Sequence, residues 1–262
     1  MNDRTPTSLN ASVISNAAPA VAISDSRPVE GAYAPPMTVS AIEAFEPLSR
    51  SESMDRIVNF VIAGAALVII SPLMLLVALA VKLTSPGPAF YTQTRVGRDR
   101  RRARERGTDN RRRNNSGGSL FTIYKFRSMR TDAEVGGQAI WAVQNDPRVT
   151  PIGAFLRKSR LDELPQFINV VKGDMNIVGP RPERPQIFVE IAEQIPEYRL
   201  RALAKPGITG WAQINHTYDT CLDGVRIKVR YDLEYLRSAS ILTDVAIMAK
   251  TIPVMLLRRG GW

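Results

Sequence analysis

Cysteine and histidine are almost missing from this chain, which has one of each, Cys221 and His216. A single cysteine excludes an intramolecular disulfide framework, so we expect most of the chain to face the cytoplasm. The same scarcity argues against a cysteine–histidine nucleophile and against a zinc site, since zinc is usually held by several such ligands. Any metal ion here is expected to be a hard cation bound by oxygen atoms.

Acidic residues are also in short supply, with 25 Asp and Glu against 35 Lys and Arg and a formal net charge of +10. Such a balance indicates an anionic partner, which could be nucleic acid, anionic lipid or a phosphorylated substrate. Nine arginines and three acids lie between Arg98 and Arg113, inside a hydrophilic stretch that extends to residue 119. No aromatic residue interleaves with these arginines, as nucleic-acid binding would favour. We therefore expect a solvated loop against lipid headgroups and no nucleic-acid partner.

The first part of the chain changes character abruptly at about residue 49. Residues 1–48 are rich in Ala, Ser, Pro, Thr and Asn without an apolar period, which predicts a disordered tail. From Phe60 to Val81 there is no charged residue, and this run is long enough for a helix to cross the hydrocarbon core of a membrane. The alternative is a buried core helix.

Ser71 and Pro72 interrupt the apolar run near its middle. Proline has no N–H and clashes with the carbonyl four residues earlier, so we expect the helix to kink or break there. A kink fits a tilted crossing, and it also fits a re-entrant helix that returns to the same side. Basic residues after the run place its end in the cytoplasm, but they leave the topology open.

The remainder indicates an α+β fold that is mainly helical. Leu120–Met129 alternates as a strand, with Ile123, Lys125 and Arg127 on one face. From Pro151 onward the pattern is mainly helical, with helices expected over 225–236 and 241–257. The last of these is apolar on most faces, which is typical of an interfacial helix beside a bilayer.

An acidic pair, Asp162 and Glu163, precedes Pro165 at the expected start of a helix. The exposed N–H groups at such a start favour an ionised carboxylate or a bound phosphate. One interpretation is purely structural, because Ser159 and Asp162 have the spacing of a capping box. The other is catalytic, since a carboxylate can attack phosphorus while a second carboxylate holds Mg²⁺.

Basic residues surround the acidic pair in the sequence and favour the catalytic interpretation. Arg181 lies between Pro180 and Pro182, a stiff setting that suits bidentate capture of phosphate. The other candidate phosphate ligands are Lys125, Arg127, Arg148 and Arg157.

Three segments resemble the bacterial sugar transferase family: YKFRSM (124–129), NDPRVTPIGAFLRKSRLDELPQFINVVKGDMNIVGPRPE (145–183) and KPGITGWAQ (205–213). These monotopic phosphoglycosyl transferases begin exopolysaccharide and related glycoconjugate synthesis. The resemblance implies that Asp162 attacks the β-phosphorus of a UDP-sugar and that polyprenyl (undecaprenyl) phosphate then accepts the sugar phosphate. It also implies that Glu163 binds Mg²⁺, that phosphates contact Lys125 and Arg157, and that Arg181 and its prolines line the nucleotide pocket.

The resemblance further implies a membrane arrangement. Ser71 and Pro72 match the break of a re-entrant helix, which gives a membrane-embedded segment 49–84 and a catalytic domain 85–262 on the cytoplasmic face of a bacterial inner membrane. A homodimer is also suggested. The chain departs from the family in its long Arg-rich insertion, residues 98–119, and in His216, where we would expect glycine. The alternative function is a catalytically silent membrane scaffold in a polysaccharide assembly complex.

Overall fold

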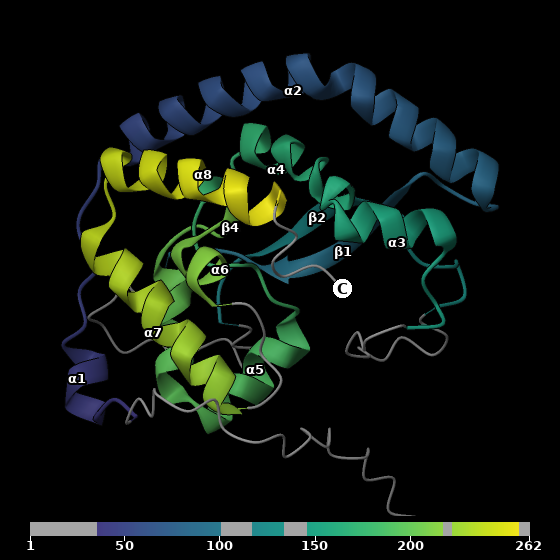
Figure 1. Ribbon diagram of the computed structural model, residues 1–262. Coiled ribbons are helices and arrows are strands. Elements are labelled where there is room, and N and C mark those ends of the chain that lie inside the picture. The colour runs from purple at the N-terminus through teal and green to yellow at the C-terminus, as the bar shows by residue number, and fades with distance from the viewer. Residues whose placement is uncertain (1–35, 101–116, 134–145, 217–221, 257–262) are drawn as a thin grey trace, which may run out of the picture.

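A computed structural model describes residues 36–100, 117–133, 146–216 and 222–256. This part of the chain is mostly helical and contains two small two-stranded sheets, which confirms the expected α+β class (Figure 1). In chain order the elements are α1 (Val39–Glu43), α2 (Glu52–Thr84), β1 (Phe90–Val96), β2 (Leu120–Phe126), α3 (Pro151–Lys158), the 3₁₀ turn η1 (Leu161–Glu163), α4 (Gln166–Lys172), β3 (Asn176–Val178), α5 (Pro185–Gln194), the 3₁₀ segment η2 (Pro196–Leu203), β4 (Gly207–Thr209), α6 (Trp211–Asn215), α7 (Leu222–Ser238) and α8 (Ile241–Leu256).

The long apolar helix α2 runs without interruption through Pro72 and changes direction near its middle (Figure 1). Pro72 cannot donate to the carbonyl of Val68, four residues earlier. The hydroxyl of Ser71 donates to that carbonyl instead, at 2.9 Å. Of the kink or break expected at Pro72, the structure shows a bend within one continuous helix, in which a side-chain donor takes the place of the missing N–H.

Among the described residues, α2 is the one helix that is long and apolar enough to cross a membrane, by length and composition. Only 11% of its most apolar stretch is buried, which argues against the alternative of a core helix. Its exposed apolar side chains follow the whole helix: Met54, Ile57, Phe60, Val61, Ile62, Val68, Ile69, Leu73, Leu75, Leu76, Leu79 and Leu83.

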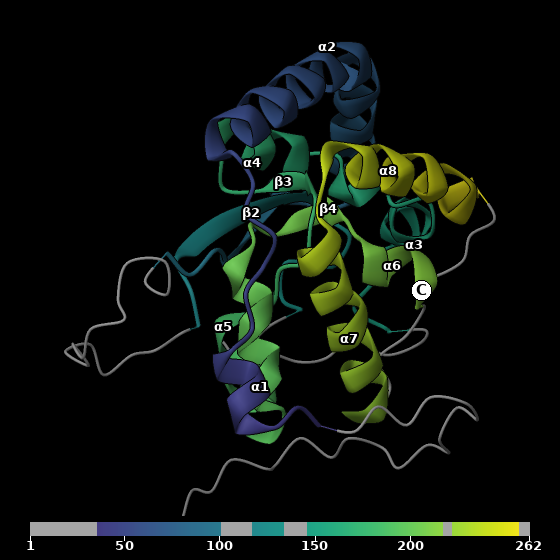
Figure 2. The same cartoon turned by 90° about the vertical axis from the view of Figure 1, so that its left-hand side faces the viewer.

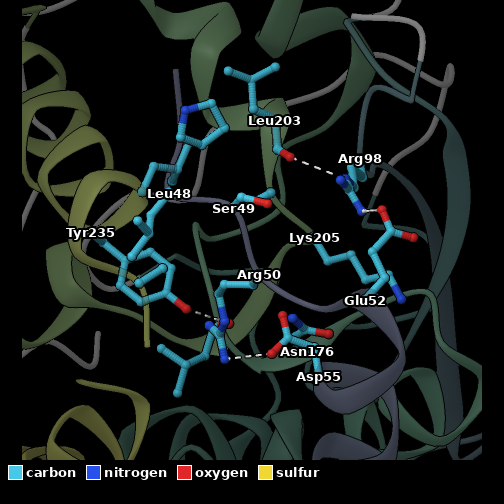
Figure 3. A pocket seen from close by; sticks show the side chains of 15 residues that line it. Leu48, Ser49, Arg50, Glu52, Asp55, Arg98, Asn176, Leu203, Lys205 and Tyr235 are labelled. Atoms are coloured by element: carbon cyan, nitrogen blue, oxygen red, sulfur yellow. Dashed lines mark hydrogen bonds and ion pairs between the residues drawn. The ribbon is translucent and has the colours of Figure 1, made fainter. Parts of the chain in front are cut away.

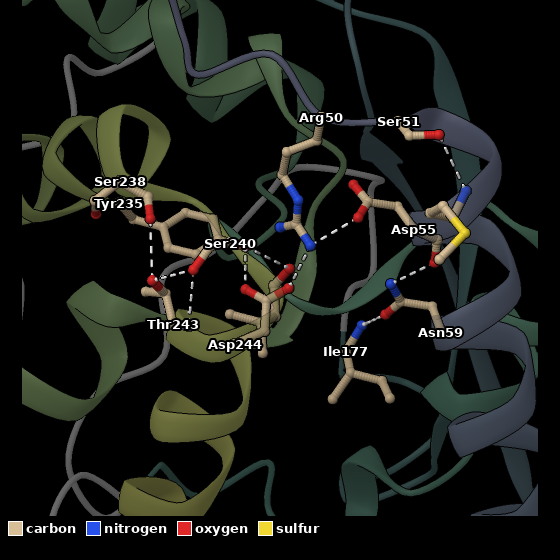
Figure 4. Close-up of polar contacts among 12 residues, drawn as sticks. Arg50, Ser51, Asp55, Asn59, Ile177, Tyr235, Ser238, Ser240, Thr243 and Asp244 are labelled. Atoms are coloured by element: carbon tan, nitrogen blue, oxygen red, sulfur yellow. Dashed lines mark hydrogen bonds and ion pairs between the residues drawn. The ribbon is translucent and has the colours of Figure 1, made fainter.

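Polar contacts fasten the first half of α2 to the rest of the molecule (Figure 4). Asn59 is buried, and its side-chain oxygen accepts a hydrogen bond of 2.7 Å from the N–H of Ile177 in β3. Arg56 donates to the carbonyls of Val170 and Val171 at the end of α4, at 2.7 and 2.5 Å. The carbonyl of Val170 also accepts from the N–H of the capping residue Gly173, so Arg56 adds to the capping of the last turn of α4.

The second half of α2 packs on a separate apolar cluster. Val77 and Val81 are buried against Phe126 at the end of β2 and Leu156 of α3. Both halves of α2 therefore lie against the same body of the protein, as Figures 1 and 2 show.

The two sheets bring distant segments together. β1 and β2 are antiparallel, with Phe90 opposite Phe126 and Val96 opposite Leu120, so the predicted strand is confirmed but ends three residues earlier than expected. β3 and β4 are parallel, with Asn176 opposite Gly207. α5 and η2 form the connection between β3 and β4. Tyr198 and Leu200 of η2 are buried in the main core.

Part of the expected disordered tail is folded in the structure. Residues 39–43 form α1, Phe45 is buried, and the N–H of Leu48 donates to the carbonyl of Leu236 at 2.8 Å. The expectation fails for residues 36–48. Apolar side chains of this segment pack on the main core, although they show no regular period in the sequence. Residues 1–35, most of the Arg-rich insertion (101–116) and Cys221 lie outside the described residues.

The two helices expected near the C-terminus are present as α7 and α8. Residue 257, expected at the end of the last helix, lies outside the described residues. α8 exposes Ile241, Leu242, Val245 and Ile252, with Leu242 82% exposed. Figures 1 and 2 place α8 on the side of the molecule that α2 covers.

Candidate active site

The acidic pair lies in the short 3₁₀ turn η1, between α3 and α4. α3 ends at Lys158 and is followed by its capping residue Ser159, whose hydroxyl donates to the carbonyls of Phe155 and Leu156 at 2.7 and 3.2 Å. Arg160 then adopts a left-handed backbone conformation with φ of 55°, which reverses the chain before η1. Ser159 therefore closes the preceding helix, and the capping-box interpretation is wrong.

Glu163 is held by three cations from different segments. Its Oε1 accepts from Lys125 Nζ at 2.9 Å and from Arg181 Nη2 at 2.5 Å, and its Oε2 accepts from Arg181 Nη1 at 3.3 Å. Arg160 lies 3.9 Å from Oε2. Burial alone would raise the pKa of Glu163, but Arg181 and Lys125 outweigh it and hold the pKa well below its usual range. Glu163 is thus a fixed negative charge.

Asp162 is equally enclosed, with 8% of its surface exposed, but it is not paired in the same way. Within the described ranges, its carboxylate makes no hydrogen bond or ion pair. Burial raises the pKa of Asp162, the charge of Lys125 opposes this, and the neighbouring charge of Glu163 adds to it. Asp162 is therefore a carboxylate with unused acceptor capacity beside a cluster of cations.

The loop that carries Arg181 is fixed by contacts on both sides. The carbonyl of Pro180 accepts from the N–H of Gly207 at 3.0 Å, and Pro182 is buried. The carbonyl of Arg181 accepts from Arg201 at 3.0 Å, and Arg201 itself forms a buried ion pair of 2.6 Å with Asp232. Arg181 thus meets Glu163 from a stiff backbone, which suits a group that must also meet a phosphate.

Of the other predicted cations, Arg157 is the one whose charge acts on Asp162. It extends from α3, donates to the hydroxyl of Ser128 at 3.1 Å, and its charge lowers the pKa of Asp162.

Arg127 and Arg148 are engaged elsewhere. Arg127 is buried at the end of α2, where it donates to the carbonyl and hydroxyl of Ser85 at 2.8 and 2.7 Å. Arg148 binds Asp146 at 2.8 and 2.5 Å, and its hydrogen bonds lower the pKa of Asp146 to about 2. Neither arginine contacts the acidic pair in the part of the chain that the structure describes.

Sequence reasoning missed Arg160 and the ion pair of Arg201 with Asp232. Arg160 is two residues from Asp162, but its left-handed conformation has no signal in the sequence. Arg201 and Asp232 lie 31 residues apart with no shared motif, so a pattern could not pair them.

The acidic pair fits a magnesium ion that also binds a substrate phosphate. Mg²⁺ commonly takes one or two protein carboxylates and completes its shell with phosphate oxygens and water. Asp162 has unused acceptor capacity, and Oε2 is the less engaged oxygen of Glu163, since its cations lie at 3.3 and 3.9 Å. The described residues contain no group of three or more His, Cys, Asp or Glu arranged for a metal.

Comparison with known proteins supports a transferase site. A profile described as bacterial sugar transferase matches residues 50–258. The chain belongs to the bacterial sugar transferase family. Family membership confirms the resemblance seen in the three sequence segments, and the match includes α2 together with the acidic pair.

Three relatives illustrate the range of the family. The UDP-glucose:undecaprenyl-phosphate glucose-1-phosphate transferase of Escherichia coli K12 is 43% identical over 202 residues, 76% of this chain and 39% of that protein. The UDP-N-acetylgalactosamine-undecaprenyl-phosphate N-acetylgalactosaminephosphotransferase of Aeromonas hydrophila is 42% identical over 199 residues, 76% of this chain and 43% of that protein. An exopolysaccharide production protein of Rhizobium leguminosarum is 37% identical over 204 residues, 76% of this chain and 92% of that protein. The chain thus spans about two fifths of the length of the first two relatives.

Proposed function

We propose that this protein is a phosphoglycosyl transferase that moves a sugar 1-phosphate from a UDP-sugar to polyprenyl phosphate. The observation that carries the proposal is the contrast within the acidic pair. Glu163 is clamped by Lys125 and Arg181, whereas the buried Asp162 beside it keeps its carboxylate unpaired within the described residues. The relatives named as UDP-sugar:undecaprenyl-phosphate transferases support the same reaction.

The reaction takes two displacements at one phosphorus atom. In the first, an oxygen of Asp162 attacks the β-phosphorus of the UDP-sugar, the bond to the bridging oxygen breaks, and UMP leaves with that oxygen. A phosphosugar–aspartate acyl phosphate remains. In the second, an oxygen of polyprenyl phosphate attacks the same phosphorus, the bond from phosphorus to the Asp162 oxygen breaks, and Asp162 is regenerated as a carboxylate.

The cations around Glu163 act on the charge of the reacting phosphate. Arg181 and Lys125 are fixed before substrate arrives, so they can stabilise the charge on its oxygens without reorganisation. Arg157 approaches from α3 and is expected to contact the same group. Glu163 holds these donors in place and would also hold Mg²⁺, which supplies further positive charge to the diphosphate when bound.

The arrangement of α2 supports a re-entrant membrane helix. The first half is tied to α4 and β3 through Arg56 and Asn59, and the second half packs on Phe126 and Leu156. Because one domain contacts both halves, we infer that both ends of α2 lie on the same side of the bilayer. The basic residues after α2 favour the cytoplasmic face of an inner membrane.

The sugar and the pathway are narrower proposals. The relatives are named for glucose and for N-acetylgalactosamine, so the transferred group is a hexose or N-acetylhexosamine 1-phosphate. A relative named for exopolysaccharide production supports a role in starting such a polymer. The scaffold alternative is less well supported, because the complete set of an acidic pair and its cations is in place.

The experiment is a UMP-release assay with the protein in lipid nanodiscs, polyprenyl phosphate and a panel of UDP-sugars. Asp162→Asn keeps the size of the side chain and removes its negative charge. We expect a loss of activity of about 10³-fold or more, with unchanged melting behaviour. Asp132→Asn, at an exposed aspartate outside the acidic pair, is the matched control. Full activity of Asp162→Asn would rule out the covalent mechanism.

A further inference from the structure

A cavity of about 330 Å³ lies beside the first turn of α2 (Figure 3). Its polar walls come from the segment before α2, from the chain after β1 and from the chain after η2. Figure 3 shows Lys205, Arg98 and Glu52 on one side of the cavity and Tyr235 and Leu48 on the other. The volume falls at the lower end of the range for small-ligand sites.

This cavity is separate from the acidic pair. Arg98 follows the end of β1 at Val96, whereas Lys125, which holds Glu163, pairs with Tyr91 near the start of the same strand. A strand advances about 3.3 Å per residue, so Val96 and Tyr91 are about 16 Å apart along the sheet. The cavity therefore requires an explanation of its own.

Most charges that line the cavity are already balanced. Arg50 binds Asp55 at 2.7 Å and Asp244 at 2.9 Å. Arg98 binds Glu52 at 2.6 Å, but the Glu52 side chain is 75% exposed. An exposed carboxylate contributes little to such a pair and can be displaced by another anion.

Lys205 is the cation of the cavity that forms no ion pair among the described residues. In the ranges that the structure describes, its ammonium makes no hydrogen bond or ion pair. Burial and the charges of Arg56, Arg100 and Arg98 lower the pKa of Lys205, whereas the charge of Glu52, the acid that pairs with Arg98, raises it. A bound anion would relieve this repulsion and raise that pKa.

The backbone around Lys205 is fixed. The carbonyl of Pro206 accepts from the N–H of Asn176 at 2.9 Å, and Gly207 pairs with Asn176 in the parallel sheet. A residue before proline has few backbone conformations. Lys205 is thus presented to the cavity from a preorganised position.

We propose that this cavity is a second anion site, in which Lys205 and Arg98 bind a phosphate group. The site lies beside the exposed apolar residues Met54 and Ile57 at the start of α2, where a bilayer would present phosphate headgroups. Two sources carry the same chemistry: the headgroup of an anionic phospholipid and a soluble phosphate compound.

The test uses the full chain with two ligands and measures binding directly. Retention of phosphatidylglycerol over phosphatidylcholine is measured by native mass spectrometry, and binding of inorganic pyrophosphate by calorimetry. We expect Lys205→Gln to weaken the binding of the phosphate ligand by about tenfold or more. Lys82→Gln, which removes an exposed lysine at the other end of α2, should leave both measurements unchanged.

Glu52→Gln gives a change in the opposite direction that misfolding cannot imitate. It removes the anion that competes for Arg98, so binding should become about three- to tenfold tighter. A Lys205-dependent preference for phosphatidylglycerol identifies a lipid headgroup, and Lys205-dependent binding of pyrophosphate alone identifies a soluble phosphate. The proposal is overturned if neither ligand depends on Lys205, if Lys82→Gln causes an equal loss, or if Glu52→Gln does not tighten binding.

Discussion

Arg181 meets Glu163 through both terminal nitrogens, at 2.5 Å to Oε1 and 3.3 Å to Oε2, although 18 residues separate them in the chain. The two residues come from η1 and from the loop after β3, so their contact forms only when α4 and the parallel sheet are in place. Lys125 shares Oε1 and adds β2 to the same junction. The acidic pair is therefore a product of the assembled fold and not of one local motif.

Replacing Glu163 with glutamine should remove the ion pairs that hold Lys125 and Arg181 in position. Arg181 and Lys125 lose their common anion, and one oxygen of the amide cannot replace both contacts. We expect UMP release to fall by about 10²–10³-fold and the free energy of unfolding to fall by about 1–3 kcal/mol. Steady-state kinetics and thermal denaturation measure the two effects. Glu193→Gln, at an exposed position on α5, is the control, and equal losses in both variants would contradict the role of Glu163.

The acid limb of the pH–activity profile, where activity falls at low pH, should reflect the protonation of Asp162. Burial raises its pKa above the ordinary aspartate value of about 3.9. As the pH falls through this raised pKa, the nucleophile becomes protonated and activity is lost, so the limb lies above pH 3.9. The pH profile of kcat/KM for the UDP-sugar reports the pKa values of the essential groups in the free enzyme.

The same limb should move when Lys125 is replaced. The charge of Lys125 lowers the pKa of Asp162, so Lys125→Met should shift the limb to higher pH as well as reduce the rate. Lys158→Met removes an exposed lysine of α3 and should leave the limb in place. A shift to lower pH in Lys125→Met would show that another group controls the profile.

The two ends of α2 should be accessible from the same side of the membrane. Ser49→Cys and Lys82→Cys, each in a Cys221→Ser background, place a thiol near either end. In inside-out and right-side-out vesicles, a membrane-impermeant reagent should label both thiols only when it reaches the cytoplasmic face. Labelling of the two thiols from opposite faces would establish a full crossing instead.

Loss of the Asn59 side chain should loosen α2 from the catalytic domain. Asn59→Ala leaves the buried N–H of Ile177 without its acceptor, which costs about 1–3 kcal/mol. The melting temperature in detergent should fall, whereas Val61→Ala, at an exposed position two residues away, should change it little. If Val61→Ala lowers the melting temperature as much, the hydrogen bond of Asn59 is not the anchor.

The sequence predicted what depends on local pattern. The apolar run, the strand around Lys125 and the helices of the C-terminal half follow from periodicity, and the structure confirms them. Proline chemistry predicted a kink or a break at Pro72, and the structure has a bend there, where the hydroxyl of Ser71 bonds to the carbonyl of Val68.

The positions of charged side chains could not be predicted in the same way. Arg127 and Lys125 share a strand face by alternation, yet Arg127 turns to Ser85 at the end of α2 while Lys125 reaches Glu163. Arg148 is taken by Asp146, two residues away. Which partner a long cation meets depends on the packing of distant elements. The position of α1, which packs against η2, depends on such packing as well.

The length of α4 has a consequence for the lipid substrate. Arg56 binds the last carbonyls of this helix, and the acidic pair lies just before its first residue. Seven helical residues span about 10 Å, so the acidic pair lies within about this distance along α4 of the end that Arg56 fastens to α2. With α2 embedded in a bilayer as we propose, α4 would hold Asp162 within reach of the membrane surface. The proposed polyprenyl acceptor could then offer its phosphate there while its isoprenoid chain stays in the bilayer, and it would not have to be extracted into water.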